Sequence, residues 1–278
     1  GLGLEVLLSL KIPDEVFYDM STVRDVIMRI EQLRNFSDFP TAHPEAPERS
    51  EGDEGSHYAA QAIQKSWGEI LREEPKEEIL QKIRIKPRII DWVLTYIFKS
   101  SFKFMFRIFW LLRIKAIDNL PKDGPYLICP NHASFLDGFV IFSSLPLKLA
   151  INTYFVGFSY IFEYPLFKWA LKAARLLPID PDINLTDAMQ AVSYLLSHKK
   201  IVCIFPEGLR SVDEKVKEFK KGVGILIKEL DIPVVPVYIK GSHQSWPRTS
   251  LLPRFYPVRV VFGKPVTLKE LIMGAKVR

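Results

Sequence analysis

The sequence predicts an α/β fold: a largely parallel sheet flanked by helices, preceded by an amphipathic helical segment and a small helical amino-terminal piece. Two observations predict the sheet. Short apolar runs rich in β-branched residues recur after residue 114, and helical stretches separate them. The chain has 278 residues, of which 48% are hydrophobic, so it is long and apolar enough for a packed core and is not a fully disordered chain.

Composition and hydropathy patterning divide the chain into five segments. Residues 1–34 are predicted to form short amphipathic helices, and residues 35–57 form a linker rich in Pro, Glu, Ser and Gly. Residues 58–87 are a charged helical segment, and residues 88–113 are unusually aromatic. Residues 114–278 carry the strand–helix alternation and form the main domain.

The charge is distributed unevenly along the chain. Residues 1–80 contain 8 Lys/Arg against 17 Asp/Glu, whereas residues 81–278 contain 30 against 15. The basic part is expected to bind an anionic partner, such as a phosphorylated substrate, an anionic lipid or a nucleic acid. The two cysteines, Cys129 and Cys203, exclude a disulfide scaffold and fit a reducing compartment, and no Cys/His cluster has zinc spacing.

Two further features concern targeting. No stretch of 18 uncharged apolar residues occurs, so no simple spanning helix is predicted. The chain starts at Gly1 without a signal-peptide pattern, and we expect it to be a piece of a longer protein.

Residues 88–113 combine eight aromatic residues with a polar stripe. On a helix, residues four positions apart drift by only about 40°, so the stripe winds slowly and the remaining circumference is apolar. This pattern is typical of an interfacial, membrane-docking helix, which Ser100-Ser101 could divide into two. The alternative is a helix that covers the core with its lysines in solvent, and both can hold for different faces. The stripe consists of Asp91, Thr95, Lys99, Lys103 and Arg107.

Functional residues in parallel α/β sheets lie on loops at the carboxyl ends of strands. Helices are expected at 184–197 and 219–230. The expected strands are Tyr126–Cys129, Lys148–Tyr154, Ile201–Phe205, Pro233–Ile239 and Val258–Phe262.

The first motif, Asn131 to Asp137, follows the first of these strands. Inside one helix His132 and Asp137 would point about 140° apart, so they can meet only if His132 lies on the loop and Asp137 in the first helical turn. An Asp that accepts a hydrogen bond from one imidazole nitrogen leaves the other nitrogen free to take a proton. The alternative is structural: Ser134-x-x-Asp137 is also a capping-box variant, which would make His132 an ordinary loop residue.

The second motif, Phe205 to Ser211, follows the third strand. Gly208 would allow close backbone approach, and Arg210 would bind a phosphate with its guanidinium fork. The alternative is a tight strand exit with a solvated arginine. Basic residues before a helix amino terminus suit an anion, although such a run is also typical of a solvated face. These are Lys215, Lys217, Lys220 and Lys221.

Together the two motifs resemble those of the glycerolipid acyltransferases of the 1-acylglycerol-3-phosphate acyltransferase (PlsC-type) family. The likeness covers roughly residues 88–270 and extends to the segments 220–222 and 232–237. The residues that carry it are Asn131-His132-x-x-x-x-Asp137 and Phe205-Pro206-Glu207-Gly208-x-Arg210-Ser211.

The resemblance implies a peripheral or monotopic membrane enzyme at the cytoplasmic face. It would move a fatty acyl group from a thioester to the hydroxyl of a lysophospholipid, above all 1-acylglycerol-3-phosphate, in phospholipid biosynthesis. By this match His132 is the general base and Asp137 its orienting partner, with Arg210 and Lys221 on the acceptor's phosphate. The implied substrate-binding residues are Glu207, Gly208, Arg210 and Lys221.

The resemblance also implies the partners. The donor is acyl-CoA or an acyl carrier protein, and no cofactor, metal or nucleic acid is expected. Residues 88–113 would contact an anionic membrane surface. Residues 1–34 faintly resemble the carboxyl-terminal part of an acyl carrier protein domain, through Ile12–Glu15 and Thr22–Val26, but the Asp-Ser-Leu that carries phosphopantetheine is absent.

Departures from the family pattern leave the acceptor open. Leu209 stands where the family usually has Thr. Pro181 stands where the family often has an arginine, for which Arg175 is a candidate substitute. Lysophosphatidylethanolamine and glycerol 3-phosphate are therefore alternative acceptors. A non-catalytic lipid- or carrier-binding module and a hydrolase are alternatives from other functional classes.

Overall fold

The computed structural model describes residues 65–157, 175–179, 184–211, 213 and 216–274. The expected carrier-like piece 1–34, the linker 35–57 and the beginning of segment 58–87 lie outside these residues, so the predicted boundaries there remain predictions.

A seven-stranded sheet forms the centre of the described chain, in the order β1-β7-β6-β2-β5-β3-β4. Neighbouring strands are parallel except for β6 and β7, which are antiparallel, so β2, β3, β4, β5 and β6 share one direction. This confirms the predicted largely parallel sheet of an α/β fold. The strands are β1 Arg113–Lys115, β2 Tyr126–Pro130, β3 Thr153–Gly157, β4 Leu176–Pro178, β5 Ile201–Cys203, β6 Val234–Lys240 and β7 Arg259–Phe262.

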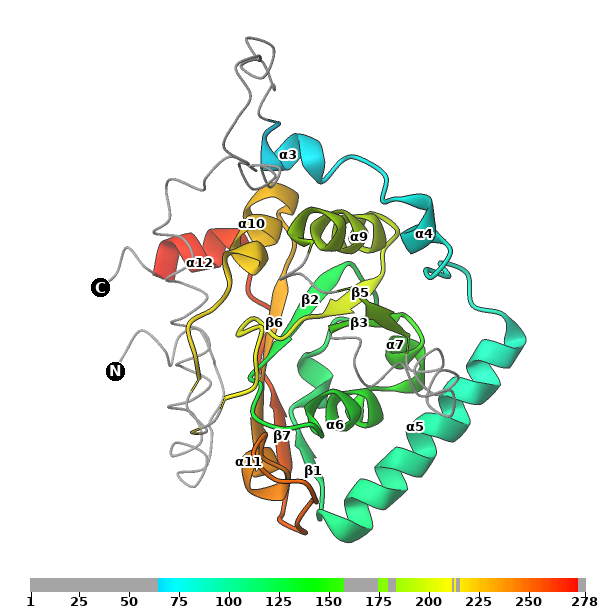
Figure 1. Cartoon of the computed structure of the whole chain (residues 1–278), viewed down its shortest axis with the longest axis vertical. Helices are drawn as coiled ribbons and strands as arrows, with labels where there is room; N and C mark the ends of the chain where they lie inside the picture. Colours follow the sequence, from blue (N-terminus) through cyan, green and yellow to red (C-terminus); the bar gives the residue numbers. More distant parts are fainter. Residues whose placement is uncertain (1–64, 158–174, 180–183, 212, 214–215, 275–278) are drawn as a thin grey trace, which may run out of the picture.

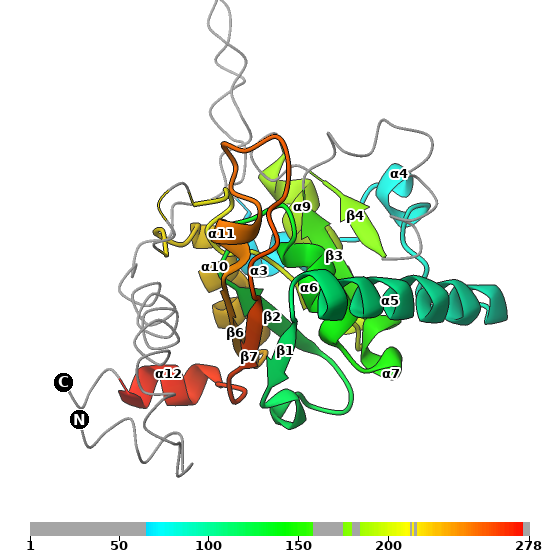
Figure 2. The ribbon, with the colours of Figure 1, turned by 90° about the horizontal axis from the view of Figure 1, so that it is seen from below.

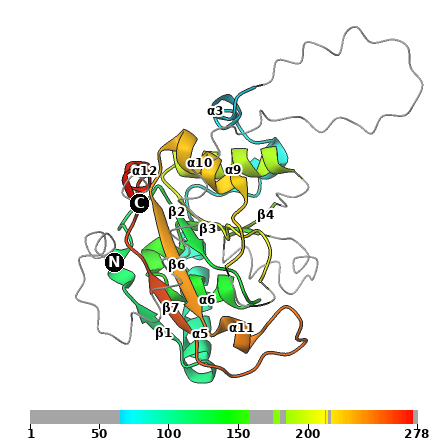
Figure 3. The same cartoon turned by 90° about the vertical axis from the view of Figure 1, so that its left-hand side faces the viewer.

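Helices cover both faces of the sheet (Figure 1). α9 and α10 lie on one face, and α5 and α6 lie on the other, with α5 as a long rod at the side of the domain (Figures 2 and 3). The helices are α3 Trp67–Ile70, α4 Glu77–Leu80, α5 Ile89–Phe109, α6 Asp137–Ser144, α7 Leu147–Ala150, α9 Leu185–Ser197, α10 Lys221–Leu230, α11 Ser242–Ser245 and α12 Leu268–Gly274, with a 3-10 turn at Ile117–Asn119.

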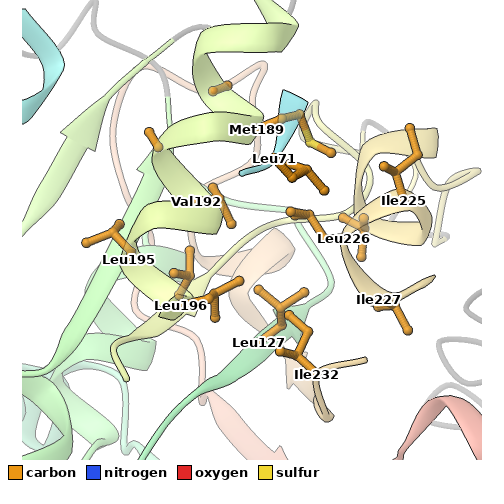
Figure 4. Packing of buried hydrophobic residues seen from close by; sticks show 14 of the residues in the cluster. Leu71, Leu127, Met189, Val192, Leu195, Leu196, Ile225, Leu226, Ile227 and Ile232 are labelled. Atoms are coloured by element: carbon orange, nitrogen blue, oxygen red, sulfur yellow. The ribbon is translucent and has the colours of Figure 1, made fainter. Parts of the chain in front are cut away.

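Alternation along the buried central strand β2 builds two cores. Leu127 and Cys129 belong to the core under α9 and α10, whereas Tyr126 and Ile128 belong to the core under α5 and α6. All four are fully buried, as the apolar run predicts for a strand covered on both faces. In the first core, leucines of α9 pack toward β2 and α10 (Figure 4).

Aromatic rings fasten α5 to α6 in the second core. Phe106 of α5 is fully buried, and Phe102 stacks on Phe139 with ring centroids 5.0 Å apart. Phe98 lies 6.4 Å from Phe142 by the same measure. Because α6 begins with Asp137, this packing also positions the first motif.

Two expected elements differ from the structure. α5 runs unbroken through Ser100-Ser101, since a serine costs under about 0.7 kcal/mol of helix propensity and aromatic packing exceeds that. The run Lys148–Tyr154 is not one strand: α7 occupies its beginning and β3 starts at Thr153. Pro146, whose ring presets φ, is the N-cap that starts α7.

Replacing Leu195, which is fully buried in α9, with Ala should lower the free energy of unfolding by about 2–5 kcal/mol, because it leaves a cavity beside the sheet. Leu185→Ala is the control: Leu185 starts the same helix but is 41% exposed, so its replacement should change stability by no more than about 0.5 kcal/mol. Urea denaturation followed by circular dichroism measures both. A Leu195→Ala protein as stable as the wild type would contradict the packing of α9.

Candidate active site

The first motif lies at the carboxyl end of β2, as predicted. Asn131 joins this end to the neighbouring strand β6: its Oδ1 accepts from the Ile239 N–H at 2.7 Å, and its Nδ2 donates to the Ile239 carbonyl at 3.1 Å. The chain then forms a short loop and enters α6 at Asp137. The loop therefore starts from a fixed point on the sheet.

Asp137 holds this loop through one carboxylate oxygen. Its Oδ2 lies 2.9 Å from the Nδ1 of His132 and accepts from the N–H groups of Ala133 and Ser134, each at 2.7 Å. Because a carboxylate oxygen only accepts, Nδ1 carries the hydrogen and Nε2 is left with a lone pair. The two residues meet with the geometry expected for a base and its orienting partner.

The imidazole of His132 is held from a second side. Its ring stacks on Phe205 of the second motif, with centroids 4.0 Å apart and an interplanar angle of 26°. The His132 side chain remains 20% exposed while that of Asp137 is fully buried. A small molecule can thus reach the imidazole ring, whereas the carboxylate of Asp137 is shielded from water.

Glu207 connects the two motifs. Its Oε1 accepts from the His132 N–H at 2.8 Å, and its Oε2 accepts from the Lys217 N–H at 3.0 Å. The Ser211 N–H also donates to the His132 carbonyl at 2.7 Å. Burial raises the pKa of the Glu207 carboxyl to about 7, although both main-chain hydrogen bonds lower it. These contacts make Glu207 a positioning residue for the His132 loop.

The surroundings of Arg210 suit a side chain that binds an anion. Its Cζ lies 3.4 Å from the centroid of the Phe135 ring, and its Nη1 is buried without a hydrogen-bond partner among the described residues. Burial lowers the Arg210 pKa, and the charge of Arg248 lowers it further. An unpaired buried donor costs about 1–3 kcal/mol, which a phosphate oxygen would relieve.

Arg248 is a residue that the sequence reasoning missed. It follows α11, at the carboxyl end of β6, and no motif marks it. The signal that could have found it is the order of the strands, which sets the ends of β2, β5 and β6 side by side.

Gly208 and the lysines shape the second loop. Gly208 adopts φ +71°, and a Cβ there would meet the Lys220 side chain at 3.0 Å, so the close approach is to Lys220. Lys220 donates its N–H to the Pro206 carbonyl, and Lys217 donates from Nζ to the Arg210 carbonyl at 3.3 Å. Lys221 is the first residue of α10, at the end of the same loop.

Arg175 does not belong to this site. It precedes β4, at the amino edge of that strand, and its Nη1 donates to the Arg84 carbonyl and to the Tyr154 hydroxyl, at 2.8 and 2.7 Å. The expectation that it might replace the family's arginine is therefore wrong. Asp180 and Pro181 lie outside the described residues. Across the described part of the chain, no group of three His, Cys, Asp or Glu side chains is placed to hold a metal ion.

Sequence comparisons relate this site to known proteins. The family model "Acyltransferase" matches residues 112–240. The chain is 31% identical over 163 residues to a protein of Brassica napus named 1-acyl-sn-glycerol-3-phosphate acyltransferase BAT2, chloroplastic. The aligned residues make up 57% of this chain and 46% of that protein. The LPAT1 protein of Arabidopsis thaliana with the corresponding name is also 31% identical, over 57% of this chain and 44% of its own length. The chain thus spans about half the length of the curated relatives that it matches.

A solved structure supports the fold. The 1-acyl-sn-glycerophosphate acyltransferase PlsC of Thermotoga maritima superposes with a TM-score of 0.52 at 23% identity, covering 69% of this chain and 81% of that one. The match to the family model spans both motifs, and the fold that presents them is similar to that of PlsC. Residues 112–240 thus match the acyltransferase family model, and the chain is similar in sequence to 1-acyl-sn-glycerol-3-phosphate acyltransferases and in fold to PlsC.

Proposed function

We propose that this chain transfers a fatty acyl group from an acyl thioester to the free hydroxyl of a lysophospholipid, with 1-acylglycerol-3-phosphate as the acceptor. The observation that carries the proposal is the His132–Asp137 pair, whose Nε2 can act as a base, together with Arg210, whose buried Nη1 has no hydrogen-bond partner among the described residues. The names of the relatives in Brassica and Arabidopsis support the same acceptor.

The mechanism is a direct transfer. Nε2 of His132 removes the hydroxyl proton of the acceptor as its oxygen attacks the thioester carbonyl, and Asp137 stabilises the imidazolium that forms. The tetrahedral intermediate collapses, the carbon–sulfur bond breaks, and the thiolate takes the proton back from His132. The nucleophile comes from the substrate, so no covalent enzyme intermediate is needed. Arg210 binds the phosphate of the acceptor, and Lys221 is proposed to assist it.

Membrane attachment through α5 is part of the proposal. The helix is turned so that Asp91, Thr95 and Lys99 face the domain, while its exposed side is apolar except for Ser101 and Arg107. The alternative in which the lysines are solvated fails for Lys99, which is only 9% exposed. No described helix is sufficiently long and apolar to span a bilayer. The exposed apolar residues of α5 are Ile89, Ile90, Trp92, Val93, Tyr96, Ile97, Phe104, Ile108 and Phe109.

A matrix of donors and acceptors tests the reaction. Acyl-CoA and acyl carrier protein are each offered with 1-acylglycerol-3-phosphate, lysophosphatidylethanolamine, glycerol 3-phosphate or no acceptor. Thioester consumption that depends on 1-acylglycerol-3-phosphate and yields the diacyl product supports the proposal. Release of free fatty acid without acceptor indicates a hydrolase, and binding without turnover indicates a non-catalytic module; either result rejects it.

His132→Ala should lower the transfer rate by about 10²–10⁴-fold, because the base that takes the hydroxyl proton is lost. His198, which is exposed and bonded to the Tyr194 carbonyl at 2.8 Å, supplies the matched control His198→Ala, which should retain the wild-type rate. A folded His132→Ala protein that transfers acyl groups at the normal rate would exclude His132 as the base.

Arg210→Ala should raise the KM for the acceptor by about tenfold or more, since a hydrogen bond to a charged group contributes about 1.5–3 kcal/mol. The KM for the thioester should change much less, and initial rates measured against each substrate separate the two. Arg72→Ala, at an exposed position after α3, serves as the control. An equal rise in both KM values would argue against a phosphate ligand.

Glu207 should make stability depend on pH. Its carboxyl has a pKa of about 7 when folded, above the usual 4.5, so between these pH values the folded state binds more protons than the unfolded state. The wild type should therefore lose up to about 3 kcal/mol of unfolding free energy as the pH rises through this range, and Glu207→Gln should not. Urea denaturation at pH 5 and pH 8 measures the difference, with exposed Glu218→Gln as control. A difference between Glu207→Gln and wild type that stays constant with pH would contradict the assignment.

A further inference from the structure

The segment that follows α11 exposes a second set of large apolar side chains. Leu251 is 89% exposed, Leu252 72% and Phe255 69%, and Tyr256 is also exposed. Apart from Leu185 and Leu209, every exposed large apolar residue of the described chain lies either in residues 89–111 or in this segment. Such a concentration marks an interaction surface, because exposed apolar residues are ordinarily scattered singly.

This segment and the end of α5 form one continuous surface. The Phe255 ring stacks on Phe109 with centroids 5.2 Å apart and meets Trp110 edge-on at 5.4 Å. The Trp110 Nε1 donates to the Arg254 carbonyl at 2.9 Å, and the Val258 N–H donates to the Trp110 carbonyl at 2.8 Å. Figures 1 and 3 show the chain after α11 beside the carboxyl-terminal end of α5. The two elements are therefore held at a fixed position relative to each other.

The charge around this surface is positive. Residues 92–117 and 232–269 contain no Asp or Glu. Exposed arginines lie in or next to these two segments of the sequence, at positions 107, 113, 248 and 254. A second copy of the chain would bring the same charge to this face, and like charges across an interface are unfavourable. An apolar surface with a cationic rim instead complements a bilayer that contains anionic lipid.

The segment after α11 is also joined to the His132 loop. The Ser134 hydroxyl donates to the Trp246 carbonyl at 2.8 Å, and the Trp246 ring lies 5.3 Å from that of Phe135, which supports Arg210. The Trp246 Nε1 in turn donates to the Ser250 carbonyl at 3.1 Å. Trp246 and Ser250 are only four positions apart in the sequence, so a fixed connection leads from the exposed leucines to the His132 loop.

We propose that Leu251–Tyr256 is a second membrane-inserting element, which docks on an anionic bilayer together with α5 and holds the His132 loop at the level of the lipid headgroups. The inference rests on the proposed function in taking the acceptor to be a membrane lipid. Insertion places a lysophospholipid's phosphate at the height of Arg210 while its acyl chain stays in the bilayer.

The first test replaces both leucines with aspartate, Leu251→Asp/Leu252→Asp, in the full chain. Partitioning onto vesicles of phosphatidylcholine and phosphatidylglycerol is measured by co-sedimentation. At least a tenfold loss is expected, because two apolar tips no longer enter the bilayer and their charges repel anionic lipid. Leu185→Asp, on the opposite face of the sheet, should partition like the wild type. Wild-type partitioning of the double variant would overturn the proposal.

Activity separates this inference from the proposed function. The double variant should lose kcat/KM toward vesicle-embedded acceptor but retain it toward a short-chain, monomeric lysophosphatidate. An equal loss toward both acceptors would overturn the role of the segment in membrane access. If neither protein transfers acyl groups, the proposed function fails, while the partitioning result still decides the inference.

Fluorescence gives a test that does not rely on a charged variant. Cys129 and Cys203 are fully buried, so a cysteine introduced by Leu252→Cys can be labelled selectively with an environment-sensitive dye. Vesicles should shift its emission to the blue, and spin-labelled lipid should quench it, whereas dye at Leu185→Cys should not respond. An unresponsive dye at position 252, or a blue shift caused by self-association without vesicles, would refute membrane insertion.

Discussion

One carboxylate oxygen organises the His132 loop. Oδ2 of Asp137 accepts from the His132 ring and from the N–H groups of Ala133 and Ser134, so it fixes the imidazole and the backbone that carries it in a single interaction. Asp137 is fully buried and begins α6, which packs against α5 through aromatic rings. A loop held in this way can keep Nε2 aimed at a substrate without spending binding energy to order itself.

Glu207 performs the corresponding task between loops. It accepts main-chain hydrogen bonds from His132 and Lys217, which lie far apart in sequence. The Ser211 N–H adds a second bond between the two loops by donating to the His132 carbonyl. The two hydrogen bonds that Glu207 accepts explain why a carboxylate stands at a buried position. An amide at this position could not accept from both N–H groups with equal geometry, since one of its two ends is a donor. The high pKa of Glu207 is the cost of placing this carboxyl in the interior.

The sequence predicted what is local and missed what depends on distant neighbours. The contact between His132 and Asp137 could be predicted from their spacing and from the expected strand–loop–helix order, because the two residues are only five positions apart. The contact between Glu207 and the His132 backbone spans 75 residues and exists because β2 and β5 are adjacent, which no motif states. Arg248 was missed for the same reason. Helical periodicity likewise defined the polar stripe of α5 without saying which way it faces.

The direction of that stripe is hard to explain in water and easier to explain at a bilayer. In water, turning Lys99 inward removes hydration from its charge, and burial indeed lowers its pKa, while the outward aromatic side chains gain nothing. If α5 docks in a membrane as proposed, the balance reverses. Lysine facing hydrocarbon at mid-bilayer would cost about 2.5–3.5 kcal/mol, and apolar side chains facing it are stabilised. The orientation of α5, with Lys99 toward the protein and Tyr96, Phe104 and Phe109 outward, is then the arrangement of lower free energy, and the exposed leucines beside it follow the same rule.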